Sequence, residues 1–593
     1  MNTKCERNLK IVVIVAFIFI ALALIQIARN SPATGYELSI YSALPVSTWV
    51  FLITALVAGI FIIVHQAFTE NEGSESNLWM LGFFILIMIN FIILSLHIFR
   101  GYYLYAKGDP LGHLGHTNFI VSNGFLSETN FVPVTHILGA ILIEICSIQT
   151  LEVMKYLPVI FTILSMIFVY FLATAVTFKR GQALLAAVTG STLLYSYYHV
   201  TTYPQALSLL TFPLVFYLYF KASEAPSMAY KTMFVILLLL FPFFHPAPEV
   251  VLIFCMVGGE LAKAFMNFRW KRREPNYGMY PQGKISANPA LISFTIFFMW
   301  FSSFTIFSYG ARKFQEWFSE EVTEIVPRVE EVELVMEMEL WERIQLIFKM
   351  YGDQFIYLFL ALIAVAIIFR YISRRREYKN LFILAILFLI SGPVYILIFM
   401  GGLTTVGRLA GANTVIWVTP VLSAFVLYKL FKRPKISKTV GIAAVIFILV
   451  FSSTLSIFTV YHSPLILQPN WQVTQMDMRG SGWVGSNVKV PRHELAPMGW
   501  LGGYHWVKIP DHFGYREHER LGDSISRDTY IMLTKRFKLA ALDPTLATKG
   551  MMISGDLARP GFDECDFERL EKDASVDRLY TNGEFEVLLA ARR

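Results

Sequence analysis

Long apolar runs separated by short polar connections fill the first three quarters of this chain. Most runs approach the ~20 residues that an α-helix needs to cross a hydrocarbon core of about 30 Å. The apolar runs lie at residues 11–28, 46–66, 78–99, 134–150, 154–178, 182–199, 204–222, 231–244, 249–267, 289–309, 352–371, 381–400, 414–431 and 439–461. The pattern therefore predicts a mainly α-helical, polytopic transmembrane bundle over residues 1–461.

The polar connections differ in charge, and the difference predicts an orientation. Lysine and arginine gather in short loops at residues 269–273, 370–379 and 429–438, which the positive-inside rule places in the cytoplasm. A basic start also precedes the first run. A secretory signal peptide would look similar, but this run is long and no clean cleavage site follows it, so we expect an uncleaved span with the N-terminus inside.

Orientation also constrains the number of crossings. The polar loop at 100–136 must lie outside and the basic loop at 269–273 inside, and six full crossings between them would break that parity. We predict that the run at 134–150, which contains His136 and Glu144, dips in without crossing. About 13 spans remain, with the C-terminus outside. A full crossing at 134–150 with another segment re-entrant is the alternative.

Two further segments are expected on the outer face. Residues 310–351 alternate glutamate with apolar residues at helical spacing, which predicts amphipathic surface helices divided at Pro327. Residues 462–593 contain no spanning run, and we predict a small soluble α/β domain there. Within it, residues 566–572 predict a short helix, and the Thr-Asn-Gly at 581–583 predicts a β-hairpin with a type I′ turn.

Composition agrees with a membrane protein. Of the 593 residues, 55% are hydrophobic and 16% are charged, whereas soluble proteins carry about 25% charged residues. The net charge of +7 resides largely in the cytoplasmic loops, so we expect membrane lipid rather than nucleic acid as a partner. The four cysteines are scattered and form neither a CxxC metal motif nor a disulfide framework. We expect a multi-pass protein of the cell membrane.

The loop at 100–136 carries the candidate chemistry. Pro110 suits the first position of a helix and Asp109 suits its N-cap, which predicts a helix over residues 110–122 that stops at Asn123. Asp109 therefore has a purely structural explanation as a helix cap. The alternative is a reacting carboxylate.

Two histidines follow Asp109 at helical spacing. His113 lies four residues after Asp109 and His116 three residues further on, so the three side chains share one face of the predicted helix. A carboxylate with two imidazoles predicts either a site for a divalent metal such as Mg²⁺ or Mn²⁺, or a proton-transfer cluster. An ordinary amphipathic helix with a histidine pair remains the alternative.

The order of these features resembles the GT-C superfamily of membrane glycosyltransferases, in particular its poorly characterised archaeal members. The resemblance rests on a long apolar span, the loop with Gly-Asp-Pro and histidine, an Asn-Gly turn, the Phe-x-Pro-x-x-His motif ending at His136, many further spans and an outer C-terminal domain. It implies transfer of a sugar from a polyprenyl- or dolichyl-phosphate donor to a protein, glycan or lipid acceptor. The superfamily's acidic residue, a general base or metal ligand, matches Asp109.

Other residues are candidate substrate contacts in this interpretation. An inverting transfer releases a lipid phosphate, which needs cationic or metal stabilisation. Arg408 lies in a glycine-rich outer loop and suits bidentate phosphate contact, although an interfacial, snorkelling arginine is the alternative. His113, His116 and His136 are further candidates.

Ionisable residues at other positions interrupt or border the apolar runs. Buried charges are costly in a membrane and are tolerated mostly where they line a cavity, so His245 and Glu249 are also candidate substrate contacts. A wet outer turn is the alternative for both. His199 and Tyr203, at the outer ends of their runs, are weighed in the same way.

Two other functions stay open. A transporter or lipid flippase would need ionisable residues along a path at mid-membrane, whereas here they concentrate at the outer face. A non-catalytic assembly subunit would use residues 462–593 as its binding module. An outer cavity with Asp109 at its floor favours the transferase, and a through-going polar path favours transport.

Overall fold

The computed structural model describes residues 3–69, 77–105, 109–177, 179–224, 227–271, 288–308, 311–312, 338–372, 376–400, 416–432, 436–488, 495–498, 520–524, 528–549, 551–553, 556–558 and 562–592. Every structural statement below concerns these residues.

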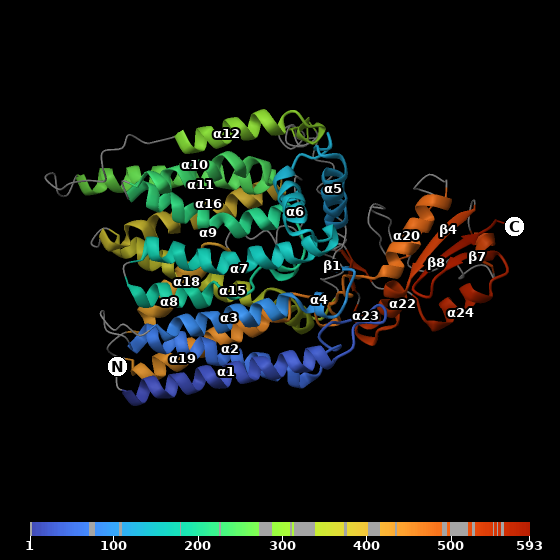
Figure 1. The fold of residues 1–593 in the computed structure, drawn as a ribbon, viewed down its shortest axis with the longest axis horizontal. Helices are drawn as coiled ribbons and strands as arrows, with labels where there is room; N and C mark the ends of the chain where they lie inside the picture. Colours follow the sequence, from blue (N-terminus) through green and yellow to red (C-terminus); the bar gives the residue numbers. More distant parts are fainter. Residues whose placement is uncertain are drawn as a thin grey trace.

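The chain is mostly helical, and its long helices run alongside one another as a bundle (Figure 1). The apolar runs form these helices because a helix satisfies its own backbone hydrogen bonds in an apolar environment. In chain order the bundle contains α1 (Thr3–Arg29), α2 (Val46–Thr69), α3 (Leu78–Leu94), α7 (Thr150–Val176), α8 (Arg180–Thr189), α9 (Pro204–Glu224), α10 (Met228–Leu240), α11 (Pro246–Lys271), α12 (Asn288–Phe301), α15 (Leu340–Tyr371), α16 (Lys379–Met400), α18 (Thr419–Phe431) and α19 (Lys438–Ile457).

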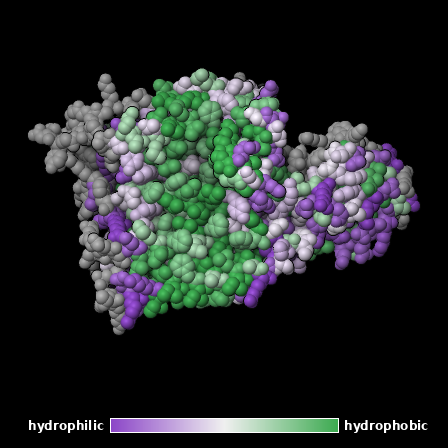
Figure 2. All heavy atoms as spheres, viewed as in Figure 1, coloured by the Kyte–Doolittle hydropathy of each residue, from purple (hydrophilic) through white to green (hydrophobic). Residues whose placement is uncertain are grey.

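Six described helices are long and apolar enough to cross a membrane, namely α1, α2, α7, α9, α15 and α19. Several others are apolar but shorter, among them α3, α10, α12, α16 and α18. The surface of the bundle is a broad apolar belt, with polar residues at its two ends (Figure 2). This distribution is typical of an integral membrane protein.

The run at 182–199 does not form one continuous helix. Helix α8 ends at Thr189, and the chain continues through irregular structure to a 3-10 turn, η1 (Ser196–His199). Polar side chains stabilise this break: Thr189 Oγ1 donates to the carbonyl of Pro420 at 2.8 Å, and Thr192 and Tyr357 share a hydrogen bond of 2.7 Å. Helix α8 is too short to span a membrane alone, so this run does not cross as a single helix. The total of 13 crossings stays a prediction.

The polar loop at 100–136 folds at the end of the bundle that faces the C-terminal region. After α4 (Leu96–Phe99) and the short strand β1 (Leu104–Tyr105), helices α5 (Asp109–Asn123) and α6 (Pro133–Cys146) lie across the direction of the bundle helices (Figure 1). This orientation supports the prediction that the run at 134–150 does not cross the membrane.

The end of the predicted amphipathic loop at 310–351 has a different structure from the one expected. Helix α15 begins at Leu340 and continues without a break to Tyr371, so residues 340–351 extend a bundle helix rather than form a separate surface helix. The sequence misleads here because amphipathic and apolar turns continue one another without a helix breaker. Residues 313–337, which include Pro327, lie outside the described residues.

The C-terminal region lies beyond one end of the bundle, and the N-terminus lies at the opposite end (Figure 1). A four-stranded sheet has the order β3-β4-β8-β7, with β3 parallel to β4 and the other pairs antiparallel. The elements of this region are η5 (Pro464–Ile466), β2 (Gln472–Val473), α20 (Gln475–Asn487), β3 (Leu495–Met498), α21 (Leu521–Ser524), β4 (Thr529–Thr534), α22 (Lys535–Leu542), α23 (Pro544–Lys549), β5 (Met551–Ile553), β6 (Asp556–Ala558), α24 (Glu564–Lys572), β7 (Val576–Thr581) and β8 (Phe585–Ala590).

The predicted helix and hairpin of this region are both present, but the turn type is wrong. Helix α24 begins with a capping box in which Asp563 and Asp566 exchange side-chain bonds with each other's backbone N–H groups. In the hairpin β7–β8, Gly583 has a φ of 90°, whereas Asn582 is not among the residues with positive φ. A type I′ turn needs positive φ at both central positions. Instead the Asn582 side chain accepts from the N–H groups of Glu584 and Phe585.

Candidate active site

Helix α5 presents Asp109 at its first turn. The helix begins at Asp109, with Pro110 second, and ends at Asn123, where Gly124 adopts a φ of 77°. Proline fits the first turn because it lacks an N–H group, and glycine fits the left-handed position that ends a helix. The predicted helix over residues 110–122 is confirmed. A carboxylate in the first turn also interacts favourably with the helix dipole, so the capping explanation of Asp109 is physically sound.

Two histidines from consecutive helices form a hydrogen-bonded chain beside Asp109. His136 Nδ1 lies 2.9 Å from the side-chain oxygen of Asn130, and His136 Nε2 lies 3.0 Å from His113 Nδ1. Because the amide oxygen can only accept, His136 donates from Nδ1 and accepts at Nε2, and His113 donates from Nδ1. In its neutral form, His113 therefore carries its lone pair on Nε2. The chain Asn130–His136–His113 orients each imidazole in turn.

The other rings of this cluster pack on the same two histidines. The His116 ring stacks on His136 with a centroid distance of 5.1 Å, and Tyr203 contacts His113 edge-on at 6.4 Å. The two histidines of α5 that the sequence singled out thus both contact His136 of α6. Residue Tyr203, which borders α9, joins them.

Burial favours the neutral form of His136 and His116. His136 is completely buried, and burial lowers its pKa well below the usual value, with further lowering from His113 and His116. Partial burial also lowers the pKa of His116. A neutral imidazole can both donate and accept a hydrogen bond, whereas the charged form only donates. Burial therefore preserves the hydrogen bond that His136 accepts from His113.

The described residues do not fit the metal site that the sequence suggested. No group of three His, Cys, Asp or Glu side chains in this part of the chain has a metal-binding arrangement. The hydrogen bond between His113 and His136 also occupies the lone pair of His136, so His136 cannot be an additional metal ligand while this bond is present. Asp109, His113 and His116 lie along one face of α5, and the hydrogen bonds of this cluster join His113, His136 and Asn130.

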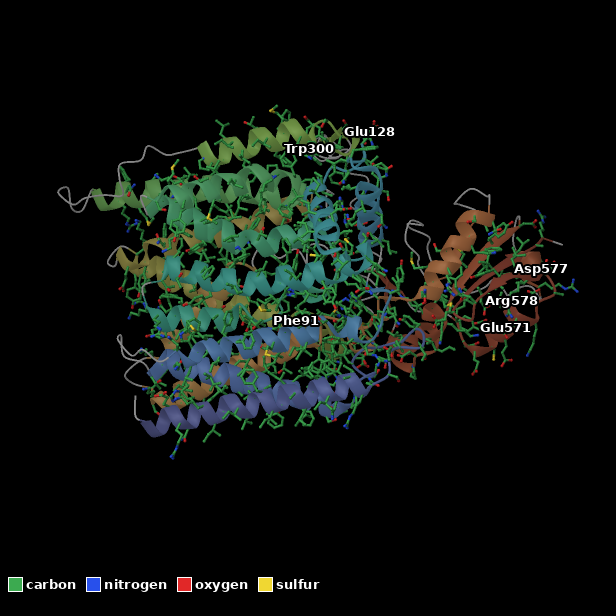
Figure 3. The ribbon with its side chains drawn as sticks, in the orientation of Figure 1. Phe91, Glu128, Trp300, Glu571, Asp577 and Arg578 are labelled. Carbon is green, nitrogen blue, oxygen red and sulfur yellow. The ribbon has the colours of Figure 1, made fainter. Side chains whose placement is uncertain are left out.

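Helix α12 contacts the segment that precedes α6. The indole N–H of Trp300 donates to the carbonyl of Phe131 at 3.0 Å, and Figure 3 shows Trp300 close to Glu128 at this end of the molecule. The Phe131 ring also contacts Phe301. These contacts hold Phe131, the residue after Asn130, and so support the position of Asn130 in the cluster.

The remaining candidates have other partners or lie elsewhere. His245 Nδ1 accepts from the N–H of Ala247 at 3.3 Å, and Glu249, which is completely buried in α11, accepts a hydrogen bond from Ser293 in α12. The described bonds of these two residues therefore lead to α11 and α12 rather than to the histidine cluster. Arg408 lies outside the described residues, so its role as a phosphate contact stays a prediction.

His199 has a structural role. It accepts the N–H of Tyr195 at Nε2 (2.9 Å) and donates from Nδ1 to Thr162 (3.0 Å). Both ring nitrogens are thus used to stabilise the irregular segment after α8. The candidate that sequence reasoning missed is Asn130, whose only local signal is its position three residues before the proline that begins α6.

Comparison with known proteins gives a fold likeness and no family. No protein-family model matches the sequence, and no curated protein matches it. A solved structure with a similar fold is the oligosaccharyltransferase of Archaeoglobus fulgidus, tethered by a disulfide to an acceptor peptide with the NVT sequon. It is 13% identical, with a TM-score of 0.43, over 69% of this chain and 57% of that chain. The chain thus spans little more than half of that protein. At this similarity the likeness assigns neither a substrate nor a site residue.

Proposed function

We propose that this protein is an inverting membrane glycosyltransferase of the GT-C type. It takes a sugar from a polyprenyl- or dolichyl-phosphate donor and passes it to a protein, glycan or lipid acceptor on the outer face. The observation that carries the proposal is the position of Asp109. It begins a helix that lies across one end of an apolar bundle, beside an ordered histidine chain and facing the C-terminal region.

Asp109 acts as the general base in this proposal. As the anomeric carbon loses its lipid phosphate and becomes oxocarbenium-like, the acceptor must give up a proton. A carboxylate at the first turn of α5 can accept it. His113, held by His136 and Asn130, presents a fixed polar group one helical turn away to position the substrate.

Two further roles complete the proposal. Arg408 neutralises the leaving phosphate as a bidentate contact. The apolar surface of the bundle accommodates the lipid tail of the donor, because a polyprenyl chain and a membrane-facing helix are both apolar.

A variant at Asp109 tests the proposal directly. Asp109→Asn keeps the size and the helix-capping ability of the side chain but removes its basicity. We expect transfer from a radiolabelled polyprenyl-phosphate sugar, measured in proteoliposomes, to fall by about 10²–10⁴-fold. The matched control is Asp577→Asn on the exposed strand β7 (Figure 3), which should retain full turnover. Wild-type turnover by folded Asp109→Asn protein would exclude Asp109 as the base.

Transport is the second candidate, because two acids are buried among the bundle helices. Glu249 is completely buried and Asp353 in α15 is 1% exposed, and one oxygen of each carboxyl group has no hydrogen-bond partner. Ionisable groups within a membrane bundle commonly mark a translocation path. Lipid flipping or solute uptake by proteoliposomes, abolished by Glu249→Gln and unaffected by Asp109→Asn, would favour this function.

A further inference from the structure

Three segments that are distant in the sequence meet directly beside the loop that leads to Asp109. One follows α1, one lies between α4 and β1, and one begins the C-terminal region. We call their meeting point the junction and define it by Tyr36, Glu37, Arg100, Tyr102, Asn470 and Gln472. All six side chains are buried or largely buried.

An ion pair lies at the centre of the junction. The guanidinium group of Arg100 donates from Nε and Nη2 to the two carboxylate oxygens of Glu37, and from Nη1 to the carbonyl of Ser31 at 2.5 Å. Tyr102 adds a hydrogen bond of 2.8 Å from its hydroxyl group to the same carboxylate. A buried carboxylate with several donors is well stabilised, and removal of one donor leaves a costly buried charge.

Two side chains of the C-terminal region complete this network. Asn470 donates from Nδ2 to the main-chain carbonyl of Glu37 (2.9 Å) and to the Tyr102 hydroxyl (3.0 Å). The main-chain carbonyl of Asn470 accepts a hydrogen bond from the Tyr36 hydroxyl (2.9 Å). Gln472 accepts from the Glu37 N–H at 2.7 Å and donates to the carbonyl of Gly35 at 3.0 Å. The C-terminal region is therefore bonded to the bundle through both backbone and side chains.

The C-terminal region contacts the chain on both sides of Asp109. Upstream, β1 pairs antiparallel with β2, with Leu104 opposite Val473 and Tyr105 opposite Gln472. Tyr105 is the fourth residue before Asp109. Downstream, Leu111, two residues after Asp109, packs with Leu104, Val473 and Met478 in one apolar cluster. Since Met478 lies in α20, helix α5 and its approach are both held by elements of the C-terminal region.

We infer that the C-terminal region positions Asp109 through the junction and the β1–β2 pair. The inference rests on the proposed function only in naming Asp109 as the reacting group. A simple attachment of two domains could use any part of the bundle end, whereas here the paired strand is the segment that leads directly to Asp109. Tyr102, Asn470 and Gln472 are thus positioning residues of the site.

Amide hydrogen exchange of the full-length protein in nanodiscs tests the inference. In Tyr102→Phe, only one hydroxyl group is lost, and peptides covering Asp109 to Thr117 should exchange about tenfold faster, since the loop that holds α5 opens more often. The matched control is Tyr357→Phe, which removes an equally buried, hydrogen-bonded hydroxyl group from the bundle core. The control should leave exchange at Asp109–Thr117 unchanged. Equal exchange in Tyr102→Phe and the wild type overturns the inference.

Two further measurements separate a positioning role from general loss of structure. Asn470→Ala should accelerate amide hydrogen exchange in the same peptides. Asn380→Ala, which removes a buried hydrogen bond to Ala175, should leave that exchange unchanged. In the transfer assay, Tyr102→Phe should lower kcat while leaving KM for the lipid-linked donor unchanged, and a change in KM alone contradicts positioning. Exchange does not depend on turnover. If Asp109→Asn retains full turnover, only the proposed function fails.

Discussion

The histidine cluster and the junction lie at the same end of the bundle but are built in different ways. The cluster takes its hydrogen-bonded members from two consecutive helices and the short connection between them, and burial favours the neutral form of His136 and His116. The junction joins a charged pair from the segments that follow α1 and α4 to side chains more than 360 residues later in the chain. One is local and neutral, and the other is long-range and charged.

The comparison shows that the candidate reacting groups and the contacts that position them belong to different parts of the structure. Asp109 and the three histidines of the cluster are close in the sequence, so α5 and α6 alone can bring them together. Their position relative to the rest of the molecule depends on contacts that form only when the whole chain has folded. A change in the cluster should therefore act locally, whereas a change in the junction should affect the stability of the bundle and the C-terminal region together.

Removal of the junction cation is expected to have the largest effect. Arg100→Ala leaves the Glu37 carboxylate buried without its ion-pair partner, which costs about 3–5 kcal/mol of folding free energy. Thermal unfolding in detergent, followed by intrinsic fluorescence, should show a large fall in Tm. The control Lys10→Ala breaks an exposed ion pair with Glu6 and should leave Tm unchanged. Similar Tm values for the two variants would show that the junction does not stabilise the fold.

The histidine cluster should make stability depend on pH. The pKa of His136 is lowered in the folded protein, so the unfolded chain takes up a proton near pH 6.5 while the folded one does not. The stability that neutral His136 contributes is thus present above pH 6.5 and is lost as the pH falls towards the folded pKa. Between pH 7.5 and pH 5 the loss is about 2 kcal/mol.

His136→Gln provides the comparison for that pH dependence. The charged form of His136 would face His113 and His116 from α5, with Asn130 as its other neighbour and Tyr203 beside His113. Glutamine cannot titrate, so the fall in Tm between pH 7.5 and pH 5 should be smaller in the variant than in the wild type. Other buried histidines contribute equally to both proteins. Identical pH slopes would contradict the burial of a neutral His136.

Loss of the first member of the histidine chain should have a moderate and local effect. Asn130→Ala leaves the buried Nδ1–H of His136 without its acceptor, at a cost of about 1–3 kcal/mol. Hydrogen exchange should accelerate in α5 and α6 but not in β1 or in the C-terminal sheet. Acceleration across all of these elements would mean that the cluster and the junction are not separate units.

The smallest effect is expected at the far side of the junction. Glu584, whose carboxylate accepts the N–H of Tyr36, follows Gly583 in the turn between β7 and β8. Because Gly583 has a φ of 90°, Gly583→Ala should cost about 1 kcal/mol and displace Glu584 slightly. Chemical denaturation should show this small change, whereas Gly485→Ala, in a helix with open space around the glycine, should not destabilise the protein. A larger loss in Gly485→Ala would contradict the role assigned to the turn.

The sequence alone determined the helical bundle, the helix over residues 110–122, the helix at 566–572 and the two strands of the last hairpin. Each of these depends on periodicity or on a local signal such as Pro110, Asn123 or Gly583, and such signals act over a few residues. The same local rules grouped Asp109 with His113 and His116. Local rules failed at residues 182–199, where the apolar pattern predicts one continuous helix. There the side chains of Thr189 and Thr192 stabilise a break in the helix.

Only the tertiary structure decided which partners these groups have. His136 joins His113 because α5 and α6 pack together across the end of the bundle, and Asn130 fixes the tautomer of His136 through one hydrogen bond. Glu37 and Arg100 meet Asn470 because folding brings the two ends of the chain to one place. Hydrogen bonds and ion pairs require contact within a few ångströms, and no local pattern in the sequence specifies a contact between residues so far apart.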